Sequence, residues 1–288
     1  MAWLAVRTHD GRDAISRGDL GQFTFRGERV PLIDAGRGIR KPGNCQAALS
    51  IMTVHTPRGG RRPYDDTDGP DGFPRYKLRG DARGSAENRS LVRAHELGMP
   101  LVWLVGVAPG WFHAIFPVFV AGIEEHLDQV VLAYDHAQAL PLPTSPMEEV
   151  LRAYAVRETR QRLHQPVFRS MVVRAYGTRC AVCALGHSQL LDAAHIVPDR
   201  DEAGVAAVRN GLALCKIHHA AYDAGIMGIT PDYIVDIRDD ILEEVDGPLL
   251  EHGLKGLHQG RLMVVPERRA ERPDRALLER RYAEFLSA

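Results

Sequence analysis

The sequence predicts an α+β protein of two domains joined by a helical linker. Its 288 residues exceed the usual size of one domain, and 45% of them are hydrophobic, which is enough for two cores. Short apolar runs fill the first half, whereas the second half gathers three of the four cysteines together with histidines. We therefore expect a mostly β domain at residues 1–140, the linker at 141–176 and a metal-containing domain at 177–288.

The first domain is predicted to be mostly β because its apolar runs are short and separated by Gly, Pro and charged residues. One segment, Glu87–Leu97, has helical composition and is followed by Gly98, which is typical of a helix C-cap. The expected strands are Val30–Ile33, Ala48–Val54, Leu101–Val107, Ala114–Ala121 and Gln129–Ala133.

The linker begins in the Pro-rich segment at residues 140–146. Ser145 suits an N-cap, Pro146 suits the first helical position, and Glu148 completes a capping box. These signals predict a helix from Pro146 to about Leu163. A second helix is expected from Pro166 to about Tyr176.

Composition and charge limit the classes of function that the chain can have. The chain has no apolar run long enough to cross a membrane and no signal-peptide pattern, so we expect a soluble, cytoplasmic protein without a membrane partner. The formal net charge is −1, so attraction to nucleic acid must come from local basic patches.

Two ligand pairs predict a structural zinc site. Cys180 and Cys183 are separated by two residues, as are Cys215 and His218, and the pairs lie about thirty residues apart, which is typical of tetrahedral zinc. Clustered cysteines in a cytosolic protein favour metal over disulfides. The adjacent His219 could exchange roles with His218, and the two-residue spacing assigns His218 to zinc.

A second set of residues is interleaved with the zinc ligands. It consists of Asp192-Ala-Ala-His195, then Asn210, then His219 and Asp223. With these residues the stretch from Arg174 to Asp236 resembles the HNH (ββα-metal) endonucleases. The resemblance implies a zinc-stapled ββα-metal fold in which His195, Asn210 and His219 are the catalytic residues that give the family its name.

The chemistry of phosphodiester hydrolysis explains these residue types. Hydrolysis needs a base to activate water, which we assign to His195, and a cation to neutralise developing charge. His219 and Asp223 are four residues apart on one helix face and suit Mg²⁺ or Mn²⁺. Many family members place a metal ligand directly before the base, where this chain has Ala194. Asp192, two residues earlier on the same strand face, is expected to replace it.

The resemblance also implies a structural role for Asn210, beside the catalytic histidines. In the family this asparagine ties the loop together and orients the base.

The first domain contains a pattern that resembles the core of SRA domains, which belong to a PUA-like fold and flip a modified cytosine out of duplex DNA. The pattern comprises Tyr64–Gly69, Phe73–Gly80 and Asn88–Leu91. It implies that Tyr64 and Tyr76 stack on the flipped base and that Asp66 accepts from its amino group. The family's Tyr-Thr-Gly is Tyr-Lys-Leu here, and such runs also mark ordinary strands and turns.

Basic residues gather in the same domain, where they would neutralise DNA phosphates. The first group lies at positions 26, 29, 37, 40 and 41, and the second lies at 58, 61 and 62. Glu28 and Asp34 interrupt the first group, and solvated loops are the alternative interpretation. The expected phosphate contacts are Arg37, Arg40, Lys41, Arg61 and Arg62.

The combined prediction is a modification-dependent, type IV-like restriction endonuclease that acts on double-stranded DNA containing modified cytosine. Because one HNH site cuts one strand, a homodimer is expected. Two alternatives stay open: a nuclease that reads another modification, such as phosphorothioate DNA, and a non-catalytic zinc-containing DNA-binding protein.

Overall fold

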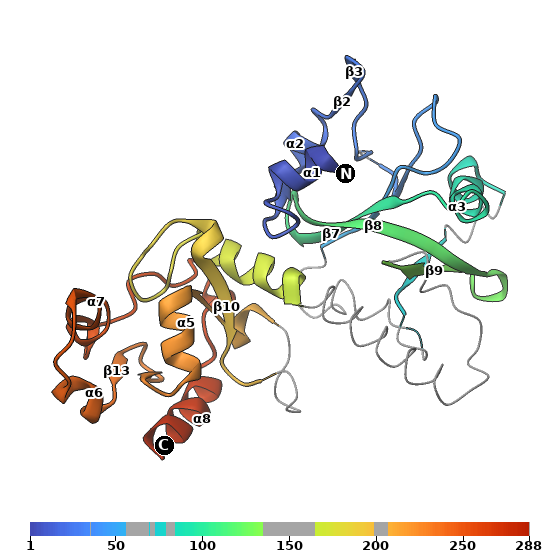
Figure 1. Ribbon diagram of the computed structural model, residues 1–288. Coiled ribbons are helices and arrows are strands. Elements are labelled where there is room, and N and C mark those ends of the chain that lie inside the picture. The colour runs from blue at the N-terminus through green and yellow to red at the C-terminus, as the bar shows by residue number, and fades with distance from the viewer. Residues whose placement is uncertain are drawn as a thin grey trace, which may run out of the picture. The chain divides into compact units, whose positions relative to one another are not determined.

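The computed structural model describes residues 1–34, 36–55, 69, 73–78, 84–134, 165–198 and 207–287. The chain divides into two compact units, Met1–Val167 and Phe168–Ala288, and both mix helices with strands (Figure 1). The α+β class is therefore confirmed. Within the described residues, no helix combines the length and apolar character needed to cross a bilayer.

A seven-stranded sheet forms the centre of the first unit, in the order β4-β5-β7-β8-β9-β6, with β1 paired to β8. Its pairs are antiparallel except for β5 with β7, which is parallel. The central β7 is buried over seven successive residues, which explains its unbroken apolar sequence. The strands are β1 (Ile15–Ser16), β4 (Ile39–Arg40), β5 (Ser50–Thr53), β6 (Arg75–Lys77), β7 (Leu101–Ala108), β8 (Trp111–Glu124) and β9 (Gln129–Ala133).

Short elements surround this sheet. They are α1 (Ala2–Arg7), α2 (Arg17–Leu20), the hairpin of β2 (Thr24–Phe25) and β3 (Glu28–Arg29), α3 (Ala86–Glu96) and the 3₁₀ turn η3 (Glu125–Leu127). The predicted helix at 87–97 is confirmed by α3. Ser85 caps it by accepting from the amide of Asn88, and Gly98 follows its end at a φ of 59°.

The strands predicted at 101–107, 114–121 and 129–133 are confirmed, and that at 48–54 is shortened to β5. The strand predicted at Val30–Ile33 is wrong. Pro31 lacks an amide donor, and Val30, Leu32 and Ile33 are all buried, so no alternation of faces occurs. The segment is a loop whose Leu32 amide donates to the carbonyl of Leu20 at 2.9 Å, and Leu32 and Ile33 join the hydrophobic core.

A helix over residues 165–175 confirms the helix expected there, and its residues from Phe168 onward belong to the second unit. The helix expected at 146–163 lies outside the described residues. The antiparallel hairpin of β10 (Leu191–His195) and β11 (Gly211–Cys215) leads directly into α5 (Lys216–Asp223). The remaining elements are β12 (Met227–Ile229), β13 (Val235–Ile237), α6 (Asp239–Glu243), α7 (Pro248–Gly253), α8 (Arg275–Leu286) and the 3₁₀ turns η5 (Ser188–Leu190), η6 (Val208–Asn210), η7 (Lys255–Leu257) and η8 (Arg269–Glu271).

The helix at 165–175 packs closely on this hairpin at Gly211. A Cβ atom at position 211 would lie 3.0 Å from Cζ of Phe168 and nearer still to the side chain of Val172. The hydroxyl of Tyr176 donates to the carbonyl of Gly211 at 3.2 Å. Because this close approach leaves no room for a methyl group, the absence of a side chain at position 211 sets the distance between helix and hairpin.

Gly211→Ala is therefore expected to destabilise the second unit by about 1–3 kcal/mol, the usual cost of overpacking a core. Thermal or denaturant unfolding of the zinc-loaded protein measures the effect. Gly247→Ala is the matched control because a Cβ there meets open space. Equal stability of the two variants would contradict the packing argument.

Candidate metal centre and active site

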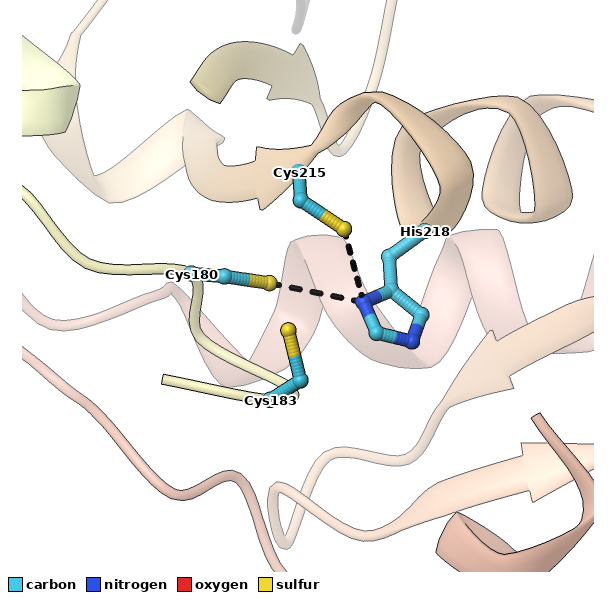
Figure 2. A group of neighbouring side chains, drawn as sticks. All are labelled: Cys180, Cys183, Cys215 and His218. Atoms are coloured by element: carbon cyan, nitrogen blue, oxygen red, sulfur yellow. Dashed lines mark hydrogen bonds between the residues drawn. The ribbon is translucent and has the colours of Figure 1, made fainter. Parts of the chain in front are cut away.

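Four metal-ligating side chains meet in the second unit (Figure 2). One ligand atom from each of Cys180, Cys183, Cys215 and His218 lies within 4.8 Å of every other. Within the described residues, this is the one group of three or more His, Cys, Asp or Glu side chains that meets this criterion. The structure thus brings together the four residues that the spacing assigned to zinc.

The dimensions of the cluster suit a tetrahedral zinc ion. Nδ1 of His218 lies 3.2 Å from Sγ of Cys215 and 3.5 Å from Sγ of Cys180. Zinc bonds of about 2.3 Å to sulfur and 2.0–2.1 Å to nitrogen would separate these ligand atoms by about 3.5 Å. Because the protein supplies four ligands, no coordination position is left for a substrate, and such a site is structural.

A carbonyl outside the cluster sets the orientation of His218. Nε2 of His218 lies 2.8 Å from the carbonyl oxygen of Gly253 at the end of α7. A carbonyl only accepts hydrogen bonds, so Nε2 carries the proton and Nδ1 presents its lone pair to the cysteines. The cluster therefore joins the 180–183 loop, the end of β11 and the first turn of α5, and the imidazole links them to α7.

The thiol pKa values depend on contacts within the cluster. A hydrogen bond with Cys215 holds the pKa of Cys180 below its usual value. Burial raises the pKa of Cys183. Since zinc binds thiolates, loading of this site releases protons and becomes weaker as the pH falls.

His219 follows His218 on α5 and points to different partners. Successive residues of a helix differ in direction by about 100°, so the two imidazoles cannot face the same ion. Nδ1 of His219 lies 3.7 Å from Oδ2 of Asp192, and Nε2 lies 3.3 Å from Oδ2 of Asp223. Each ring nitrogen of His219 thus faces a different carboxylate.

These contacts raise the pKa of His219. The close approach of the Asp192 carboxylate is the largest cause, burial opposes it, and the negative charges of Asp223 and Asp192 add to the increase. The three residues predicted to hold a catalytic cation are therefore neighbours, with the imidazole between the two acids.

Asp192 is surrounded by positive groups. Its Oδ2 accepts from Nζ of Lys216 at 2.5 Å, and its Oδ1 lies 3.9 Å from Nε of Arg169. Burial alone would raise the pKa of this carboxyl, but the neighbouring imidazole of His219 and the hydrogen bond from Lys216 outweigh it and hold the pKa well below the usual range. Asp192 is therefore ionised at neutral pH, with its charge balanced by these neighbouring groups.

His195 ends β10, and both its ring and the backbone beyond it are held in place. Its imidazole stacks on the ring of Phe168, with centroids 3.9 Å apart and an interplanar angle of 11°. The buried amide of Asn210 accepts from the nitrogen of Val197 and donates to the oxygen of Val197, both at 2.9 Å. The carbonyl of Asn210 accepts from the amide of Ile196 at 2.9 Å. Three hydrogen bonds thus fix the chain as it leaves His195.

The SRA-like pattern of the first unit is described only in part. Tyr76, expected to stack on a base, is 9% exposed, and its hydroxyl donates to the carbonyls of Gly38 and Met52 at 2.9 and 3.3 Å. Burial raises the pKa of Tyr76 to about 12. The ring contributes to the core and offers no open face in this structure. Tyr64 and Asp66 lie outside the described residues.

Two of the expected phosphate contacts have protein partners. Nη1 of Arg37 lies 2.6 Å from Oε1 of Glu87. Arg40 donates to the carbonyl of Pro31 at 3.1 Å and lies 3.8 Å from Asp34. Lys41 is half-buried, and Arg61 and Arg62 lie outside the described residues. Among the described residues of this set, Arg37 and Arg40 are therefore already paired with groups of the protein.

Three residues near the candidate site were not identified from the sequence. Lys216 directly follows Cys215, the last cysteine of the zinc cluster, and is the first residue of α5, which places it close to the hairpin. Phe168 and Arg169 carry no comparable signal, because their contacts depend on how the helix at 165–175 packs on β10.

One family model matches the segment that carries most of this site. The comparison with curated protein sequences found no match. Among solved structures, the chain is similar to one titled "Modification dependent TagI restriction endonuclease", with 19% sequence identity, coverage of 87% of this chain and 86% of that chain, and a TM-score of 0.32. A TM-score of this size does not by itself show a shared fold. Residues 180–230 match the family model described as HNH endonuclease, and this segment of the chain is therefore an HNH endonuclease domain.

Proposed function

We propose that the chain is a metal-dependent endonuclease that hydrolyses phosphodiester bonds in DNA. The observation that carries the proposal is the position of His219, between Asp192 and Asp223, on the helix whose first turn supplies His218 to the cysteine cluster. The match of residues 180–230 to HNH endonucleases supports the same reaction class.

His195 is proposed as the general base. Its imidazole would take a proton from the attacking water, the step that a general base performs in phosphodiester hydrolysis. Stacking on Phe168 limits rotation of the ring, and the hydrogen bonds of Asn210 hold the following backbone. Asn210 therefore acts on the base through the loop and makes no contact with the reacting atoms in this proposal.

Asp192, His219 and Asp223 are proposed to hold the catalytic cation. Two carboxylates and an imidazole are a donor set that accepts Mg²⁺ or Mn²⁺. Bound there, such an ion supplies positive charge to the phosphate and to the departing 3′ oxygen. Since Asp223 is 63% exposed, its side chain is able to rotate, whereas Asp192 is held from several directions.

The first unit is proposed to select the target. The proposed nuclease residues all lie in the second unit, whereas the first unit has its own sheet. The sequence pattern at 64–91 of the first unit resembles SRA domains. Within that pattern Asn88 and Leu91 are buried in α3, where they contribute to packing. Modified cytosine in double-stranded DNA is the proposed target, with another modification, such as phosphorothioate, as the alternative. A homodimer would supply one site for each strand.

His195→Ala is expected to reduce DNA cleavage in Mg²⁺ or Mn²⁺ by at least about a hundredfold, because it removes the proposed base. Zinc content and DNA affinity should be unchanged. Plasmid nicking, metal analysis and a binding assay measure the three quantities. His187→Ala, which removes an exposed histidine from the same unit, is the control.

Unchanged cleavage in His195→Ala would contradict the assignment of the base. Absence of any metal-stimulated cleavage in the unmodified chain would instead favour a zinc-containing DNA-binding protein.

Target selection is tested with matched duplexes that carry cytosine, methylcytosine, hydroxymethylcytosine or a phosphorothioate linkage. The proposal expects a modified-cytosine duplex to be cut at least about tenfold faster than the unmodified one, which corresponds to about 1.4 kcal/mol of discrimination. Preference for the phosphorothioate duplex would support the alternative, in which the first unit recognises phosphorothioate DNA. Equal cutting of all four duplexes would remove selective recognition.

A further inference from the structure

One oxygen of Asp192 has two different partners. Its Oδ2 accepts from Nζ of Lys216 at 2.5 Å and also faces Nδ1 of His219 at 3.7 Å. Its Oδ1 accepts from the amide of Ala193 at 3.1 Å and lies near Arg169. Because Oδ1 is tied to the backbone, Oδ2 is the oxygen that a cation shared with His219 would use.

Lys216 therefore lies on the atom that the proposed cation needs. An ammonium group and a divalent cation on the same carboxylate oxygen would repel each other strongly at such a short separation. One carboxylate oxygen thus has two competing positive partners.

Lys216 is able to leave Asp192, and Arg169 is not. Lys216 is the first residue of α5, and its side chain is 58% exposed on a flexible four-carbon stem. Arg169 is only 12% exposed, and its guanidinium donates to the carbonyls of Ser188 and Leu191 at 2.6 and 3.1 Å. Arg169 is held against β10 by these hydrogen bonds, whereas the exposed, flexible side chain of Lys216 can adopt other positions.

We propose that Lys216 and the divalent cation are alternative partners of Oδ2 of Asp192, and that the ammonium released from Asp192 binds a phosphate of the DNA. The inference rests on the proposed nuclease function and adds a catalytic residue to it. The lysine would neutralise phosphate charge only after the cation is in place, so DNA contact and metal loading would be coupled.

The first experiment measures Mn²⁺ binding to the zinc-loaded full-length chain without DNA, by titration calorimetry or by the electron paramagnetic resonance signal of free Mn²⁺. Lys216→Met should bind Mn²⁺ roughly three- to tenfold more tightly, because a competing ion pair is lost. Lys216→Arg, which keeps the charge, should bind as the unmodified chain does, and Asp192→Asn should lose the site.

Lys77→Met is the control, because it removes the same charge from an exposed lysine of the first unit. Unchanged or weaker Mn²⁺ binding by Lys216→Met would overturn the competition. If Asp192→Asn does not alter Mn²⁺ binding, the cation does not use this oxygen, and the inference also falls.

The second experiment measures how DNA affinity depends on salt, in the His195→Ala background so that the DNA stays intact. With Mn²⁺ present, adding Lys216→Met should lower the slope of log affinity against log salt by about one, the value for one phosphate contact. Without Mn²⁺ the slope should not change, because Lys216 is then paired with Asp192. An equal reduction of the slope with and without Mn²⁺, or no reduction in either condition, would overturn the proposed movement of Lys216 from Asp192 to a phosphate.

These outcomes are separable from failure of the proposed function. If the unmodified chain cuts DNA and His195→Ala does not, the nuclease assignment stands whatever Lys216 does. If neither cuts, the nuclease assignment itself fails.

Discussion

The arrangement of the candidate site depends on the contact between His218 and the three cysteines. Cys215 ends β11 and His218 lies in the first turn of α5, so a zinc ion bound by both fixes the direction in which α5 leaves the hairpin. Once His218 faces the cysteines, helical geometry turns the neighbouring His219 toward Asp192 and Asp223. A site with no open coordination position thereby orients the residues proposed to hold a second, exchangeable cation.

The helix at 165–175 supports the hairpin of β10 and β11 through direct contacts. Phe168 contacts both the imidazole of His195 and the region of Gly211, while Arg169 holds the carbonyls at the start of β10. The side-chain amide of Asn210 is hydrogen-bonded to the backbone of Val197, just after β10. The proposed base and the proposed cation ligands therefore lie on one hairpin and one helix, whose relative position is set by packing and metal binding together.

Short-range sequence patterns were sufficient to predict the parts of the site that depend on local spacing. The two ligand pairs and the choice of His218 over His219 for the cluster follow from intervals of a few residues. Contacts made by tertiary packing were not accessible in this way. No sequence interval indicates that Lys216 reaches Asp192, or that Tyr76 turns into the core. The buried loop at Val30–Ile33 has the composition of a strand because burial, not pairing, selects its apolar residues.

Two adjacent histidines are proposed to serve different metals, and the zinc content of two variants distinguishes their roles. Elemental analysis of the purified full-length protein should show that His218→Ala loses zinc, and with it the thermal stability of the second unit, because the cluster has lost a ligand. His219→Ala should retain a full equivalent of zinc. Loss of zinc from His219→Ala, or full retention by His218→Ala, would contradict the account.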